Sequence, residues 1–154
     1  MGAGYHGGFG STHGSQAISL SPIYAGDENK LKTASKWIVP KSGYTDIIIH
    51  GRPDHVEIKM GEQWAKIDHR TLARMYKGDK DYTKNPIRLI SCETGKEVNG
   101  FAQNLANKLG RKVIAPSDTV WIHPSGKITI GPNARTNSGK WISFYPKKAR
   151  YFIR

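Results

Sequence analysis

The sequence predicts an α/β domain with three layers, a mainly parallel central sheet and a C-terminal β-hairpin extension. Two short apolar runs, residues 46–49 and 87–90, are typical of buried strands. A strand–helix–strand succession over residues 87–115 predicts a βαβ unit, whose two strands should be parallel. Strand-like segments on both sides of residues 123–126, His-Pro-Ser-Gly, predict a hairpin.

Length and local composition favour one domain over residues 16–154. A chain of 154 residues can bury a core of its own. Residues 1–15 are rich in glycine and predict a flexible linker, with the look of a cut made within a larger protein. No apolar run approaches the ~20 residues of a membrane span, and the glycine-rich opening lacks the apolar core of a signal peptide.

The first half of the chain is expected to alternate strands and helices. Residues 16–23 could form a first strand, and Asp27 could cap a short helix over residues 28–36. The first central strand, residues 46–49, should then end at His50.

A hairpin and a capped helix should follow. Residues 55–60 alternate apolar and polar side chains, and residues 63–67 can pair back onto them. Asp68 is a good N-cap for a helix over residues 69–77. We expect this helix to bury Leu72, Met75 and Tyr76.

The second half contains the clearest helical pattern. Apolar residues recur at helical spacing: Val98, Phe101, Ala102, Leu105, Ala106 and Leu109. Gly110 should end this helix, and residues 112–115 should form the next strand. Residues 140–145 predict a last strand, with Trp141 and Ile142 on opposite faces.

The net charge limits the classes of binding partner, and the single cysteine limits the chemistry of the chain. The net charge of +12, from 24 Lys and Arg against 12 Asp and Glu, favours polyanions, anionic membrane surfaces or an acidic protein partner. The single cysteine, Cys92, cannot form an internal disulfide and is either a small buried residue or a reactive thiol. We predict neither a cofactor nor a metal ion.

Cys92 and His50 each follow a predicted central strand. If the two strands are parallel neighbours, their carboxyl ends meet at one edge of the sheet. A histidine there can take the proton of a thiol that attacks a carbonyl carbon. The N–H groups of Gly51 and Cys92 could stabilise the oxyanion. Either residue alone has a structural explanation, since a cysteine can finish a buried strand and a histidine can cap one. Together they favour a catalytic pair.

Other polar residues stand near the same edge. We assign Ser91, Glu93 and Asp118 to substrate binding: Ser91 is small enough to admit a substrate, and the carboxylates could bind a basic side chain. A solvated loop carboxylate is the simpler explanation for Glu93 and Asp118. Asp54 and Glu57 could orient His50.

These residues suggest a family. His50-Gly51 after one strand and Ser91-Cys92 after the next, with a helix following, resembles the caspase-like cysteine peptidases of clan CD. The chain looks closer to their compact bacterial relatives, the self-cleaving cysteine-protease domains of large toxins and the CHAT domains. The likeness to CHAT domains lies in residues 89–95, Leu-Ile-Ser-Cys-Glu-Thr-Gly. Segments 101–116, 118–121 and 141–146 also look like the C-terminal ends of bacterial polymorphic toxins of the Rhs or contact-dependent type.

The resemblance covers about residues 44–146 and carries expectations. It implies a caspase-like fold, with His50 as base, Cys92 as nucleophile, and Gly51 and Cys92 N–H groups as the oxyanion hole. It implies a cysteine peptidase toxin, delivered as part of a larger bacterial effector, that acts on a protein in the target-cell cytoplasm. A cognate immunity protein, acidic to match the basic chain, is the implied partner.

Functions of other classes stay open. A basic nuclease toxin acting on RNA or DNA could hold phosphates with Lys and Arg, though no nuclease motif with fixed spacing is visible. Its acid/base residues would be histidines: His50, His55, His69 and His123. An ADP-ribosyltransferase is disfavoured because its residue constellation is missing, and a non-catalytic caspase-like module would bury Cys92.

Overall fold

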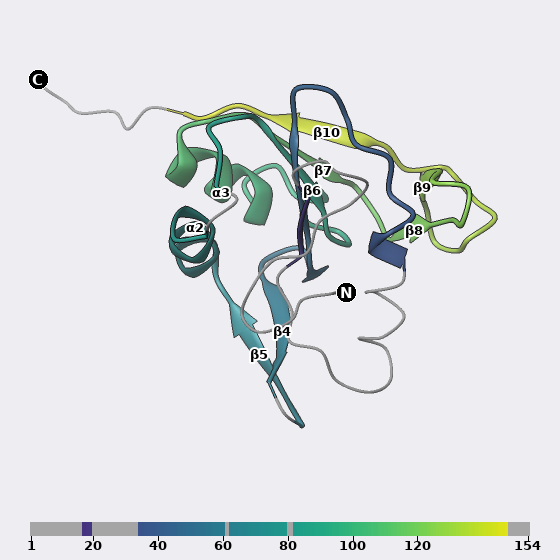
Figure 1. Cartoon of the computed structure of the whole chain (residues 1–154), viewed down its shortest axis with the longest axis horizontal. Helices are drawn as coiled ribbons and strands as arrows, with labels where there is room; N and C mark the ends of the chain where they lie inside the picture. The colour runs from purple at the N-terminus through teal and green to yellow at the C-terminus, as the bar shows by residue number, and fades with distance from the viewer. Residues whose placement is uncertain (1–16, 20–33, 61, 80–81, 148–154) are drawn as a thin grey trace, which may run out of the picture.

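The main sheet has five strands in the order β1-β2-β6-β7-β10. The computed structural model describes residues 17–19, 34–60, 62–79 and 82–147 (Figure 1). The first four strands are mutually parallel, and β10 runs antiparallel to β7 at the edge. The strands are β1 (Ala17–Ser19), β2 (Thr45–Ile48), β6 (Ile87–Ile90), β7 (Val113–Pro116) and β10 (Trp141–Phe144).

The two predicted central strands, β2 and β6, are parallel neighbours, so the condition for a meeting of His50 and Cys92 is met. Their register places Asp46 beside Arg88 and Ile48 beside Ile90. Successive side chains point to opposite faces of a strand, so Ile47 joins a large core cluster while Ile48 joins a smaller one. The carboxyl ends of β2 and β6 therefore lie side by side.

Helices α2 (His69–Lys77) and α3 (Phe101–Leu109) cover one face of this sheet. The predicted start of α2 is confirmed: the Asp68 carboxylate accepts a hydrogen bond from the Thr71 N–H at 2.8 Å. Gly110 ends α3 in the left-handed region, with φ of 71°. The large cluster joins both helices to the sheet, with Leu72, Tyr76, Phe101 and Leu105 among its members.

The predicted start of the α3 pattern is wrong. Val98 is 75% exposed, and the helix begins at Phe101 after the N-cap residue Gly100. The reason lies in the preceding turn, where the Gly100 N–H donates to the Glu97 carbonyl at 3.2 Å. Helical spacing alone cannot show that the backbone before residue 100 is committed to a turn.

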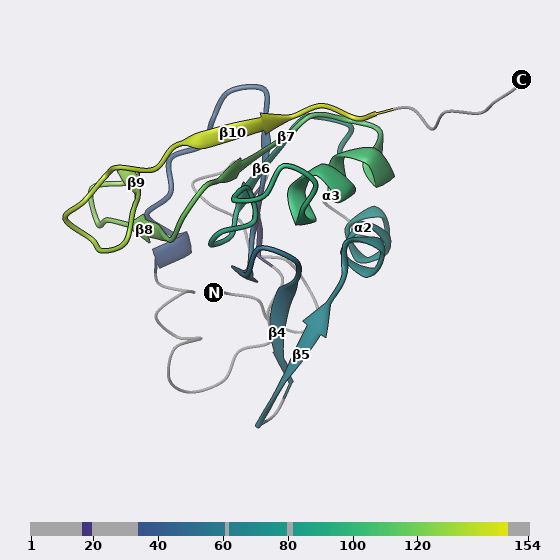
Figure 2. The ribbon, with the colours of Figure 1, turned by 180° about the vertical axis from the view of Figure 1, so that it is seen from behind.

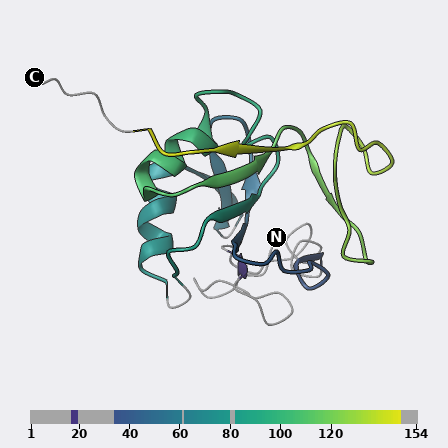
Figure 3. The same ribbon diagram turned by 90° about the horizontal axis from the view of Figure 1, so that it is seen from above.

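A hairpin covers the other face of the sheet. It consists of β8 (Val120–Ile122) and β9 (Ile128–Ile130), and it packs with Ile38 against Ile48 and Ile90. Figures 1 and 3 show the helices and this hairpin on opposite sides of the sheet. The hairpin was expected as a C-terminal extension, but it is inserted between β7 and β10, and the chain returns to the sheet afterwards.

A second, three-stranded sheet was not expected as a separate unit. It contains β3 (His50–Gly51), β4 (Val56–Met60) and β5 (Gln63–Ile67), all antiparallel. The β4–β5 hairpin is as predicted, and it projects from the body of the domain (Figure 2). His50 does not end β2, as the sequence suggested. It pairs with Glu57 in this sheet, because the β2–β6 ladder stops once the Ile49 N–H has bonded to the Ile90 carbonyl.

Some expectations concern the N-terminal region. Strand β1 lies within the predicted segment 16–23. The linker over residues 1–15 and most of the helix over residues 28–36 lie outside the described residues. In the part of the chain that the structure describes, no helix has the length and apolar character needed to cross a membrane.

A buried ion pair joins the two central strands. Arg88 Nε donates to Asp46 Oδ1 at 2.6 Å, and Arg88 Nη2 donates to Oδ2 at 2.8 Å and to the Val39 carbonyl at 2.9 Å. Asp46 is 2% and Arg88 9% exposed. Two charges this deeply buried persist only as a pair, because either one alone would lose its hydration without replacement.

The pair yields a stability prediction. Arg88→Leu should lower the free energy of unfolding by about 3–5 kcal/mol, because it leaves the Asp46 carboxylate buried without its partner. The double variant Asp46→Leu/Arg88→Leu should regain most of this loss. Arg70→Leu, on the exposed face of α2, is the control and should change stability by about 0.5 kcal/mol or less. Urea unfolding monitored by circular dichroism measures all three, and equal stability of Arg88→Leu and Arg70→Leu would contradict the prediction.

Candidate active site

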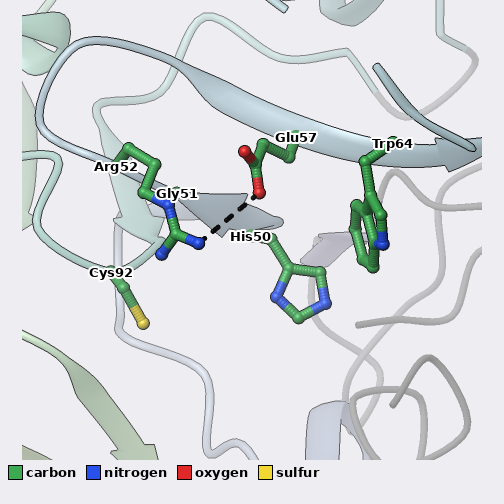
Figure 4. Close-up of a pocket in the computed structure, with 6 residues that line it drawn as sticks. All are labelled: His50, Gly51, Arg52, Glu57, Trp64 and Cys92. Carbon is green, nitrogen blue, oxygen red and sulfur yellow. Dashed lines mark ion pairs between the residues drawn. The ribbon is translucent and has the colours of Figure 1, made fainter. Parts of the chain in front are cut away.

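One cavity of about 460 Å³ opens where the carboxyl ends of β2 and β6 meet the second sheet. Its lining is His50, Gly51, Arg52, Glu57, Trp64 and Cys92 (Figure 4). The fold thus brings together four residues that the sequence singled out, His50, Gly51, Glu57 and Cys92. They come from two chain segments about forty residues apart in the sequence.

Cys92 lies in the turn that follows β6, and its sulfur is largely buried. The Val120 N–H, from the start of β8, donates a hydrogen bond to Sγ at 3.4 Å. Burial raises the pKa of the Cys92 thiol, and this effect outweighs the lowering by the Val120 N–H and by the positive charge of Arg52. The negative charge of Glu93 raises the pKa further. At neutral pH the resting group is therefore a thiol.

The turn that carries Cys92 is held firmly by backbone hydrogen bonds. Glu93 has a φ of 61°, a left-handed conformation that costs a residue other than glycine roughly 1–3 kcal/mol. The Glu93 N–H donates to the Asp118 carbonyl at 3.0 Å, and the Gly95 N–H donates to the Pro116 carbonyl at 2.9 Å. These bonds tie the turn to the end of β7 and to the segment that follows it, and they offset the strain at Glu93.

Gly51 packs directly against the same turn. A Cβ at this position would lie 2.1 Å from Ser91 Oγ, 2.8 Å from the Cys92 carbonyl oxygen and 2.8 Å from Thr94 Cγ2. Only glycine allows β3 to approach so closely. Packing therefore explains why this residue is glycine, and the part of its N–H in an oxyanion hole stays a prediction.

His50 faces the cavity from β3. Its ring packs edge-on against Trp64, with 5.1 Å between ring centroids and an interplanar angle of 82°. Figure 4 shows the imidazole and the Cys92 sulfur projecting into the same space. The sulfur's hydrogen bond goes to Val120 and not to His50. A proton would pass between the two groups only after a side-chain movement or through an intervening substrate.

Asp54 and Glu57, the carboxylates that could orient His50, contact a different histidine, His55. His55 Nδ1 lies 2.6 Å from Asp54 Oδ1, and His55 Nε2 lies 3.1 Å from Glu57 Oε2. The contact with His55 lowers the pKa of Asp54. Glu57 Oε1 also lies 4.0 Å from Arg52 Nη2, the ion pair marked in Figure 4. Glu57 therefore positions Arg52 and His55, although its Cα is opposite that of His50.

The predicted substrate-binding residues flank Cys92 but do not line the cavity. Glu93 forms an ion pair with Lys96 at 3.7 Å. The Asp118 carboxylate accepts the Thr119 N–H at 2.7 Å. Ser91 is 2% exposed, and its Oγ has no hydrogen-bond partner among the described residues. Its side chain is therefore buried beside Gly51, outside the lining of the cavity.

The four histidines of the nuclease alternative do not converge. Only His50 of this set lines the cavity. His55 is held between two carboxylates. His69 is the first residue of α2, and His123 Nε2 lies 2.9 Å from Thr129 Oγ1 in the β8–β9 hairpin. The arrangement does not assemble a shared acid/base set from these residues.

Two lining residues, Arg52 and Trp64, were missed in the sequence. Arg52 follows His50-Gly51 directly, so adjacency to a candidate base was an available signal. Trp64 is 43% exposed, although it lies in a strand. A large exposed aromatic side chain on a hairpin is typical of a binding surface, but only the fold shows that β5 brings it to His50.

The close packing at Gly51 yields a second prediction. Gly51→Ala should destabilise the domain by about 1–3 kcal/mol, the usual effect of inserting a methyl group into filled space. Gly78→Ala is the matched control, because a Cβ there would meet nothing nearer than 3.6 Å. Chemical denaturation checks both variants. Equal stability of the two would show that β3 and the Cys92 turn are not in contact.

The chain matches one family model, described as "Domain of unknown function (DUF8616)", over residues 18–130. No curated protein and no solved structure matches it. The matched region contains every residue that lines the cavity, whereas β10 lies beyond it. Because the match spans more than half of the chain, the protein belongs to the DUF8616 family of domains of unknown function.

Proposed function

We propose that this domain is a cysteine hydrolase that attacks a peptide carbonyl, with Cys92 as nucleophile and His50 as general base. One observation carries the proposal: both side chains line a single cavity at the carboxyl edge of two parallel neighbouring strands. Ligand sites of open α/β sheets lie at this edge. At this edge the lone thiol of the chain lies in the same cavity as an imidazole. This is the pattern expected of a nucleophile and its base.

The reaction follows from the state of the thiol. Because burial keeps Cys92 protonated, His50 must accept the proton as Sγ attacks the carbonyl carbon. A C–S bond forms and the carbonyl oxygen takes the electron pair. Collapse of this tetrahedral species expels the amine, which takes the proton from His50, and leaves a thioester. Water, activated by His50, then hydrolyses the thioester and releases the free thiol.

Positive groups around the sulfur would stabilise the developing charges. Arg52 and the Val120 N–H lower the pKa of Cys92, so both favour the thiolate as the proton leaves. Glu57 holds Arg52 on the cavity side of β3. The N–H groups of Gly51 and Cys92 are the proposed oxyanion donors.

We extend the proposal to the biological role through the motif resemblance. His50-Gly51 and Ser91-Cys92 after adjacent strands support a caspase-like domain, and the toxin-like segments support a role as the C-terminal toxin of a bacterial effector. The target would be a protein in the recipient cytoplasm. The net charge of +12 supports an acidic immunity protein as the neutralising partner.

Loss of either dyad member should abolish toxicity. Cys92→Ser and His50→Ala should each lower the reaction rate by roughly 10²–10⁴-fold or more, because proton transfer and the nucleophile both fail. Survival of bacteria after induced expression measures the effect. His69→Ala, on α2 outside the cavity, is the control and should remain toxic.

The same experiment separates the nuclease alternative. If Cys92→Ser stays fully toxic while cellular RNA or DNA is degraded, the peptidase proposal fails and the basic nuclease replaces it. If toxicity is lost and nucleic acids stay intact in cells that express the wild type, the hydrolase is supported.

The state of the thiol gives a pH prediction. The rate of Cys92 alkylation by iodoacetamide should rise with pH, with a midpoint above the value of about 8.5 for a free cysteine, because burial raises its pKa. Arg52→Met should move the midpoint higher, since the positive charge of Arg52 lowers this pKa. Arg70→Met should leave it unchanged. A wild-type midpoint below about 8.5 would contradict the raised pKa, and only a midpoint below about 7 would indicate a resting thiolate at neutral pH.

A further inference from the structure

A second pocket, of about 310 Å³, lies on the face of the main sheet opposite the helices. Its lining is Lys41, Tyr44, Arg88, Lys112, Ile114, Trp141 and Ser143. Tyr44 precedes β2, Lys112 precedes β7, and Arg88 is near the start of β6. On the β7–β10 side, however, the pocket runs along the sheet, because Trp141 pairs with Pro116 at the carboxyl end of β7. It shares no residue with the Cys92 cavity. The proposed hydrolase does not use it.

Two residues that line this pocket, Arg88 and Trp141, have hydrogen-bond donors that could bind a ligand. Arg88 is nine-tenths buried, and its Nε and Nη2 are occupied by Asp46 and the Val39 carbonyl. Its third nitrogen, Nη1, makes no hydrogen bond to any described residue. Trp141 is partly exposed, and its indole Nε1 has no hydrogen-bond partner in the described ranges, so this donor faces the solvent of the pocket. A ligand rich in acceptors would satisfy both groups.

Two lysine side chains add positive charge at the same place. Lys41 Nζ lies 5.2 Å and Lys112 Nζ 5.5 Å from the Tyr44 ring centroid. Lys112 Nζ also lies 5.4 Å from the Tyr145 ring. Within the described chain neither ammonium has a carboxylate within 4.0 Å, and the nearby Asp46 is taken by Arg88. The aromatic rings thus hold two cations that no carboxylate neutralises.

The walls of the pocket favour a ligand with a planar part. Trp141 packs against the small cluster of Ile38, Ile48 and Ile90 and also lines the pocket. Ile114 adds a buried apolar surface. Indole rings are good stacking platforms for nucleic-acid bases. The volume is at the lower end of the range for small-molecule sites, roughly 300–1,000 Å³, which suits one nucleotide unit.

We propose that this pocket binds a phosphorylated nucleoside. The phosphate contacts Lys41, Lys112 and the spare Nη1 of Arg88, a combination of ammonium and guanidinium groups that suits a dianion. The base stacks on Trp141. The nucleoside phosphate is either a free nucleotide or the terminal residue of a nucleic-acid strand, since both present the same chemistry. Binding is independent of Cys92 and His50.

Calorimetric titration of the whole chain with adenosine and uridine 5′-monophosphates tests the proposal. Saturable binding is expected, with adenosine and inorganic phosphate each binding at least roughly tenfold more weakly than the nucleotide. Lys41→Met and Lys112→Met should each weaken nucleotide binding by roughly tenfold or more, the effect of losing one charge-assisted contact. Lys108→Met removes the same charge from the exposed surface of α3 and should bind as the wild type does.

Further titrations distinguish a free nucleotide from the end of a nucleic-acid strand, and they define the results that would overturn the proposal. A 5′-phosphorylated tetranucleotide that binds far more tightly than the mononucleotide identifies a strand end, and equal binding identifies the free nucleotide. Cys92→Ser should bind normally, which separates this site from the proposed hydrolase. The proposal is overturned if no nucleotide binds, if inorganic phosphate binds equally well, or if Lys41→Met and Lys112→Met behave like Lys108→Met.

Discussion

The pairing of β2 with β6 is the constraint on which both sites depend. Asp46 and Arg88 face each other across these strands and form a two-contact ion pair in the interior. A shift of register by one residue would send every side chain of a strand to the other face, and Arg88 would then meet the apolar helix side. The pair therefore opposes any alternative register. The correct register places His50 and Cys92 at the carboxyl ends of the strands and Arg88 on the face of the sheet that the cationic pocket occupies.

The chemistry at Cys92 results from opposing influences on one sulfur. Burial disfavours the thiolate, whereas Arg52 and the Val120 N–H favour it. These two groups come from different parts of the fold, since Arg52 follows β3 and Val120 begins β8. The hairpin that covers the sheet thus also contacts the candidate nucleophile. Any displacement of β8 would remove a donor from the sulfur and make the thiol less acidic.

Patterns confined to one segment were predictable from the sequence. The apolar run of β6 and the Asp68 cap of α2 were predicted correctly, because each signal is local and strong. The βαβ pattern likewise predicted the parallel pairing of β6 with β7. Val98 was placed in the helix because its spacing fits, while the turn that ends at Gly100 has no periodic signal.

Contacts between segments that are distant in the sequence were harder to predict. The sequence suggested Asp54 and Glu57 as partners of His50, yet His55 takes both carboxylates because it lies between them in the chain. The approach of Trp64 to His50 depends on the pairing of β3 with the predicted β4–β5 hairpin, which no residue pattern specifies. The meeting of His50, Gly51 and Cys92 could be inferred only because their strands were expected to be neighbours.

The position of β10 has a practical consequence. The family match ends at residue 130, whereas the strand that covers the outer side of β7 is Trp141–Phe144. A fragment trimmed to the matched region would leave the backbone of Val113–Pro116 without its antiparallel partner. An exposed edge of buried apolar residues invites pairing between molecules. Recombinant fragments of this domain should therefore extend beyond Phe144 if they are to stay monodisperse.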